Sequence, residues 1–101
     1  MAGARQIQAC LNGARARGFH PRLPVTPDAL ASDAAACIAA GAIALHIHPR
    51  DGAGGETLAP EAVGAAVAAV RRAVPGVRVS VSTGDWIEQD DARQIAAIRG
   101  W

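Results

Sequence analysis

Two histidines stand two residues apart in the segment Leu45-His46-Ile47-His48-Pro49, and this spacing suits the binding of one metal ion. Successive side chains of a β-strand point to opposite faces, so a strand here places His46 and His48 on one face. Pro49 cannot donate to a strand ladder, so the pair lies at the carboxyl end of the strand. Active sites of parallel α/β folds are built at that end. We therefore predict a metal site; the alternative is two ordinary polar strand residues.

Polar residues also close two other strand-like segments. Ser82, Thr83 and Gly84 stand at the end of one segment, and Asn12 stands at the end of the other. Their hydroxyl, amide and backbone N–H groups can donate hydrogen bonds to a carboxylate. We therefore predict that all four contact a substrate. Because the same residue types favour turns, ordinary turns at both places are the alternative.

The loop after the histidine pair begins with Arg50 and Asp51. A carboxylate can orient a metal-ligating imidazole by accepting a hydrogen bond from its other ring nitrogen. Asp51 is a candidate for that role if its loop folds back. The alternative is a solvated pair of loop charges that contributes little to stability.

Strand and helix patterns alternate along the chain. They predict strands over residues 6–12, 42–48 and 77–82, with loops over 13–25 and 51–58. Thr26 is the expected N-cap of the first helix, and Gly41 follows its end. Pro60 opens the second helix, and Asp90 or Asp91 caps the third. The apolar residues at helical spacing are Leu30, Ala34, Cys37 and Ile38, then Val63, Val67, Val70 and Val74, then Ile95 and Ile98.

Strands separated by helices run parallel through right-handed crossovers. One face of the predicted sheet is apolar and should meet the helices; it carries Ile7, Ala9, Leu11, Ile43, Leu45, Ile47, Val77, Val79 and Val81. The other face is polar or small; it carries Gln8, Cys10, Asn12, Ala42, Ala44, His46, His48, Arg78, Ser80 and Ser82. A doubly wound sheet favours two apolar faces, whereas a barrel tolerates a polar interior near its rim.

A complete (β/α)8 TIM barrel needs about 250 residues. The chain has 101 residues. We therefore expect residues 1–101 to be the N-terminal part of a single TIM-barrel domain, truncated after three βα units.

Composition limits the partners and the compartment. The net charge is +1 and no basic stripe is interleaved with aromatic residues, which argues against nucleic acid as a partner. No long uncharged apolar stretch and no signal-peptide pattern is present, so we expect a cytoplasmic protein without a membrane partner. Cys10 and Cys37 are expected to be buried thiols, with a disulfide as the minority alternative.

Four motifs in order resemble the family of β-keto acid cleavage enzymes, whose best-known member is the 3-keto-5-aminohexanoate cleavage enzyme of lysine fermentation. The motifs are Leu11-Asn12-Gly13-Ala14-Arg15, the loop from His20 to Pro27, His46-Ile47-His48-Pro49-Arg50-Asp51, and Val79 to Trp86. They span nearly the whole chain, which makes the resemblance far more specific than a lone His-x-His.

The resemblance implies a zinc-dependent (β/α)8 barrel with a homo-oligomeric full-length form. Such an enzyme is an acyltransferase that converts a β-keto acid and acetyl-CoA into acetoacetate and a new CoA ester. The implied zinc ligands are His46, His48 and a late-strand glutamate beyond Trp101, where the family's arginine and aspartate for the chemistry also lie. Zinc on neutral imidazoles can accept a keto oxygen and stabilise an enolate. Many members carry a glutamate just after the first strand, where this chain has Arg15; that difference bears on substrate choice.

Two other functions remain open from the sequence. One is a different metal-dependent TIM-barrel hydrolase, in which the metal activates water. The other is an inactive fragment that acts only within a larger assembly. We expect the isolated chain to be inactive in either case, because two zinc ligands fall short of the usual three or four.

Overall fold

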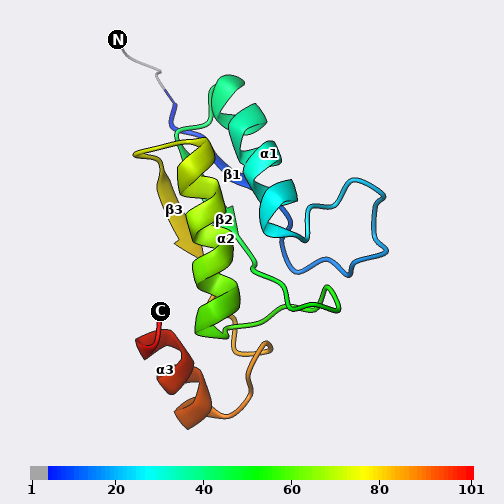
Figure 1. Ribbon diagram of the computed structural model, residues 1–101, viewed down its shortest axis with the longest axis vertical. Helices are drawn as coiled ribbons and strands as arrows, with labels where there is room; N and C mark the ends of the chain where they lie inside the picture. Colours follow the sequence, from blue (N-terminus) through cyan, green and yellow to red (C-terminus); the bar gives the residue numbers. More distant parts are fainter. Residues whose placement is uncertain (1–4) are drawn as a thin grey trace.

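A computed structural model describes residues 5–101, within which three strands and three helices alternate (Figure 1). The elements are β1 (Gln8–Cys10), α1 (Pro27–Ala39), β2 (Ala44–Ile47), α2 (Pro60–Ala73), β3 (Arg78–Val81) and α3 (Asp91–Arg99). Each element falls within or next to its predicted range, so the predicted βα alternation is confirmed. The strands are shorter than predicted at both ends.

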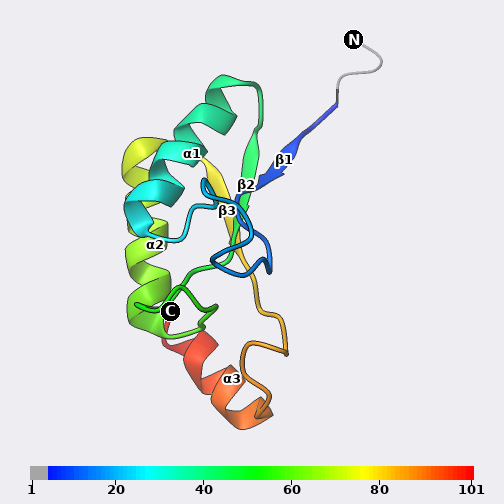
Figure 2. The ribbon, with the colours of Figure 1, turned by 90° about the vertical axis from the view of Figure 1, so that its right-hand side faces the viewer.

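The three strands form one parallel sheet in the order β1-β2-β3. The register places His46 of the central strand opposite Cys10 of β1 and Ser80 of β3. Helices α1 and α2 lie side by side on one face of this sheet, as Figure 2 shows. In the described part of the chain, the opposite face of the sheet has no helix on it. The His46 side chain therefore lies on the uncovered face.

The hydrophobic core fills the space between the sheet and the two helices. Leu45 and Ile47 of β2 are fully buried there. They pack with Leu30, Ala34, Ala66 and Val70 from α1 and α2. Ala9, Leu11, Val77, Val79 and Val81 lie half-buried against the same cluster. The predicted apolar face of the sheet is thus confirmed for these residues.

Three residues differ from the predicted burial. Ile7 and Ile43 are 58% and 51% exposed, because both precede the first residues of their strands at the amino end of the sheet. Cys10 is an exposed free thiol, because it lies on the uncovered face, and Cys37 is a half-buried free thiol. The prediction that both thiols are buried is therefore wrong for Cys10.

Capping residues explain the helix boundaries. The Thr26 hydroxyl accepts a hydrogen bond from the Ala29 N–H at the start of α1, and the Asp90 carboxylate does the same for Arg93 at the start of α3. Gly41 adopts a positive φ of 114° just after α1, a conformation that suits glycine. All three residues act as predicted.

Helix α3 is set apart from the sheet. It has no buried residue, and it lies beyond the amino-terminal end of α2 (Figure 1). Two side-chain hydrogen bonds connect α3 and the residue after it to the preceding loops. Gln94 Nε2 donates to the Thr83 carbonyl and Trp101 Nε1 donates to the Leu58 carbonyl, both at a distance of 2.8 Å. The architecture is therefore a small α/β domain consistent with part of a repeating βα fold. Among residues 5–101, no helix combines the length and the apolar character that crossing a membrane requires.

Candidate metal and substrate site

The two predicted metal ligands lie next to each other at the carboxyl end of β2. The ring centroids of His46 and His48 are 5.2 Å apart, and the ring planes are nearly perpendicular at 84°. His48 is buried, with 7% of its surface exposed, and His46 is half-buried. The sequence-predicted pair is thus brought together in space.

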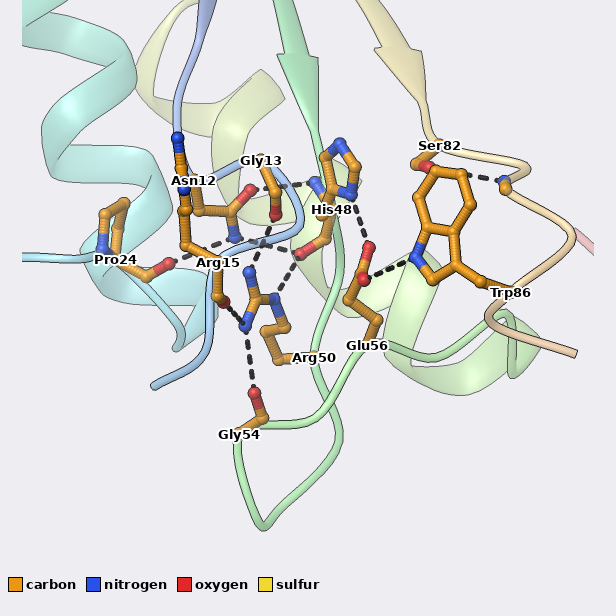
Figure 3. Close-up of polar contacts among 11 residues, drawn as sticks. Asn12, Gly13, Arg15, Pro24, His48, Arg50, Gly54, Glu56, Ser82 and Trp86 are labelled. Atoms are coloured by element: carbon orange, nitrogen blue, oxygen red, sulfur yellow. Dashed lines mark hydrogen bonds and ion pairs between the residues drawn. The ribbon is translucent and has the colours of Figure 1, made fainter. Parts of the chain in front are cut away.

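A carboxylate orients His48. Glu56, from the loop between β2 and α2, accepts a hydrogen bond from His48 Nδ1 at 2.5 Å. Its other oxygen accepts a hydrogen bond from the Trp86 indole nitrogen at 2.8 Å (Figure 3). Asp51 instead accepts from the N–H groups of Ala53 and Gly55 and closes its own loop. The carboxylate at the histidine is therefore Glu56 and not the predicted Asp51.

The environment of Glu56 favours its charged form. Burial by itself raises the pKa of the Glu56 carboxyl. The hydrogen bonds from His48 and Trp86 outweigh that effect, together with the positive charge of His48 when it is protonated and that of Arg50, and they lower the pKa below its usual value. Glu56 is therefore an ionised hydrogen-bond acceptor at neutral pH.

His46 is bound to a hydroxyl group. Its Nδ1 lies 2.7 Å from Ser80 Oγ, which also accepts a hydrogen bond from Gln8 Nε2 at 3.0 Å. Burial, and then the nearby His48, lower the pKa of His46 below its usual value. The neutral imidazole that results is the form that binds metal ions.

Asn12 holds the backbone at the histidine pair. Its side-chain NH2 group donates to the His48 carbonyl at 2.9 Å and to the Pro24 carbonyl at 3.1 Å. Its side-chain oxygen accepts from the His48 N–H at 2.9 Å. The side chain is only 3% exposed. Both amide hydrogens are therefore used within the protein, and the predicted contact of Asn12 with substrate stays a prediction.

Arg50 ties the surrounding loops together (Figure 3). Arg50 is buried, with 8% of the residue exposed, and its guanidinium group donates to four backbone carbonyls. These belong to His48, Arg15, Gly54 and Gly13, at 2.8–3.1 Å. The solvated loop charge offered as an alternative is wrong for Arg50, because its planar group of five donors matches carbonyls from three loop segments.

The Ser82-Thr83-Gly84 segment forms a turn beside the histidines. The Ser82 side chain is buried, and its hydroxyl accepts a hydrogen bond from the Gly84 N–H at 3.3 Å. The side chain of Thr83 is exposed, and its carbonyl accepts from Gln94. Because the Ser82 hydroxyl is the acceptor in this bond, it can still donate its own hydrogen to another group. Substrate binding by this segment stays a prediction, and the turn is present in either case.

The donor set fits a zinc ion in part. Two adjacent imidazoles suit zinc, and the ring nitrogen of His48 that faces away from Glu56 is the one able to bind it. No cluster of three or more His, Cys, Asp and Glu side chains suited to a metal occurs among residues 5–101. The described residues thus offer two ligands of a site that needs at least three.

A family model described as beta-keto acid cleavage enzyme matches residues 6–100. The chain belongs to the β-keto acid cleavage enzyme family. The resemblance inferred from the four motifs is confirmed. Members of this family are generally metal-dependent and act on small molecules.

In this β-keto acid cleavage family member, the contacts of Glu56 and Trp86 and the burial of Arg50 were not predicted from the sequence. Glu56 lies eight residues after His48 and 30 before Trp86, so no short motif connects the three. The glycines at 52, 54 and 55 were the available sequence signal for the position of Glu56, because they allow the loop after β2 to fold back toward the end of that strand.

We expect Arg50→Gln to loosen the loops around the site of this family member. The substitution leaves four backbone carbonyls without their charged donor, and the two in buried bonds, those of His48 and Gly54, cost about 1–3 kcal/mol each when unsatisfied. Trypsin should therefore cleave faster after Arg15, Arg17 and Arg22 in the loop before α1. Arg71→Gln, on the exposed side of α2, is the matched control. Cleavage at the wild-type rate in Arg50→Gln would show that the guanidinium does not hold these loops.

Proposed function

We propose that this chain carries the zinc-binding histidines of an acyltransferase that converts a β-keto acid and acetyl-CoA into acetoacetate and a CoA ester. The observation that supports the proposal most strongly is the adjacent pair His46 and His48 at a parallel strand end, in a member of the β-keto acid cleavage family. A zinc ion on neutral imidazoles would supply Lewis acidity at a keto oxygen.

The residues of the chain have distinct roles in this proposal. Ser82 and Thr83 bind the substrate carboxylate through their hydroxyls, and Gly84 shapes the turn that presents them. Asn12 supports the site indirectly, because its side chain holds the backbone N–H and carbonyl of His48 in place. The substrate then lies on the uncovered face of the sheet, toward which the His46 side chain points.

We also propose that residues 1–101 are the first three βα units of a (β/α)8 barrel. Three features support this: strands in the order β1-β2-β3, both sheet-covering helices on one face, and an exposed polar opposite face. The polar face carries Gln8, Cys10 and Ser80, which are exposed here. In a closed barrel these side chains would line the interior, and further strands would pair with the edges of β1 and β3.

The test is an assay of the complete polypeptide that the gene encodes, loaded with zinc. It is incubated with a panel of β-keto acids, with and without acetyl-CoA, and acetoacetate and CoA esters are quantified. We expect acetoacetate and a new CoA ester only when acetyl-CoA is present. Consumption of substrate without acetyl-CoA would favour the metal-dependent hydrolase, and no turnover of any substrate would count against enzymatic activity.

A further inference from the structure

A single carboxylate links the metal-ligand candidate to the loop after β3. Glu56 accepts from His48 Nδ1 with one oxygen and from Trp86 Nε1 with the other (Figure 3). The indole ring of Trp86 lies against Gly84, where any added Cβ would overlap the ring. Two hydrogen bonds therefore join three separate segments, and the contact of Trp86 with Gly84 lies within the last of them.

We propose that Glu56 is a positioning residue that fixes the tautomer and orientation of His48, and that Trp86, seated on Gly84, holds Glu56 in place. The part of the proposal that concerns zinc affinity rests on the proposed function. The part that concerns the tautomer of His48 stands on the geometry of the described residues alone.

The chemistry of the acceptor fixes the proton on His48. An ionised carboxylate has no hydrogen to donate, so the ring nitrogen facing it must carry the hydrogen. In the neutral ring of His48, Nδ1 is therefore the protonated nitrogen, and Nε2 keeps the lone pair that a metal ion needs. Ser80, the partner of His46, can direct its hydroxyl hydrogen to His46 Nδ1 at 2.7 Å or to the Leu45 carbonyl at 3.4 Å, so that contact fixes no tautomer. Of the two histidines, His48 is the pre-organised one.

Trp86 restricts the carboxylate to one orientation. An indole N–H only donates, so it binds the second oxygen and leaves the first directed at His48. Gly84 makes this possible, because a larger residue would displace the ring. Glycine at this position thus has a steric role that is independent of any contact with substrate.

The first test reads the tautomer directly. The chain is labelled with ¹⁵N-histidine and studied by solid-state NMR, which self-association does not disturb. Spectra are recorded at about pH 8.5, and the ¹⁵N shifts distinguish the two neutral tautomers from the imidazolium form. His20 is an internal reference, because its Nδ1 accepts from the Arg22 N–H and its hydrogen therefore lies on Nε2. We expect the opposite tautomer, with hydrogen on Nδ1, for wild-type His48.

Three variants test the cause. Glu56→Ala should shift His48 toward the Nε2–H form that neutral histidine side chains prefer in water. Trp86→Phe keeps an aromatic ring, removes the donor and should cause a smaller shift in the same direction, as should Gly84→Ala. Glu61→Ala, which removes an exposed carboxylate from the first turn of α2, should leave the spectrum unchanged. An Nε2–H tautomer in wild-type His48, or no shift in Glu56→Ala and Trp86→Phe, would overturn the proposal.

The second test measures zinc affinity of the same variants against a chromophoric chelator. We expect Glu56→Ala to lose roughly 10- to 100-fold in affinity, Trp86→Phe to lose less, and Glu61→Ala to match wild type. Unchanged zinc affinity in Glu56→Ala would overturn the link between Glu56 and metal binding. If wild type binds no zinc while the tautomer still depends on Glu56, the zinc proposal fails and the positioning role of Glu56 stands.

Discussion

In the complete polypeptide, His46→Ala and His48→Ala should each abolish acetoacetate formation, whereas Ser82→Ala should only weaken it. Each histidine substitution removes one of the two proposed ligands of the zinc ion, whose Lewis acidity would contribute several kcal/mol to stabilising charge in the transition state. Ser82→Ala removes one hydrogen bond to a charged carboxylate, which contributes about 1.5–3 kcal/mol. At about 1.4 kcal/mol for each tenfold change, that is roughly a 10- to 150-fold loss of kcat/KM.

Acetoacetate formation is measured with each of a panel of β-keto acids as substrate, and bound zinc is quantified in every variant. His20→Ala is the matched control, because His20 lies on an exposed loop and its ring accepts a hydrogen bond from the nearby Arg22 N–H. Full zinc content and near-normal turnover in His46→Ala would show that the histidines are ordinary polar residues. If Ser82→Ala changes nothing for any substrate, the segment after β3 is only a turn.

The 101-residue chain by itself should form no acetoacetate and should self-associate as its concentration rises. Among the described residues, only two imidazoles are placed to bind the metal. β1 and β3 are the edges of the described sheet, and open edges promote association between chains. The uncovered face adds exposed side chains such as Cys10 and Ser80.

Light scattering across a concentration series, combined with thermal unfolding, checks this expectation. Reducing agent is present throughout, so that a disulfide through Cys10 does not imitate association. A monomer with a cooperative thermal transition would contradict the expectation and would favour a self-contained domain. Acetoacetate formation by the isolated chain would contradict it as well.

Local signals were sufficient to predict the elements and the histidine pair. Thr26 and Asp90 cap their helices through hydrogen bonds that span three residues, so both are visible in a short window of sequence. The alternation of side chains along a strand likewise places His46 and His48 without knowledge of the rest of the fold. Leu45 and Ile47 are buried on the opposite face for the same reason.

Contacts between distant segments were not predictable from local patterns. Arg50 donates to the carbonyls of Gly13 and Arg15, more than 30 residues away in sequence. Its burial therefore depends on the path of the loop between β1 and α1, which local patterns do not specify. Glu56 was indistinguishable from a solvated loop acid until the loop path placed it at His48. Helix α3 shows the same limit, because its apolar Ile95 is 52% exposed and its spacing indicates a helix without indicating what that helix packs against.

Zinc binding by the wild-type chain and its histidine variants is the most direct measurement of the central claim, that His46 and His48 together hold a metal ion. The chain is titrated with zinc in competition with a chelator, alongside His46→Ala, His48→Ala and the control His20→Ala. The proposed site predicts weak binding in wild type and in His20→Ala, and clearly weaker binding in the other two variants, because each loses one of two ligands. Equal affinities in all four proteins would contradict the claim.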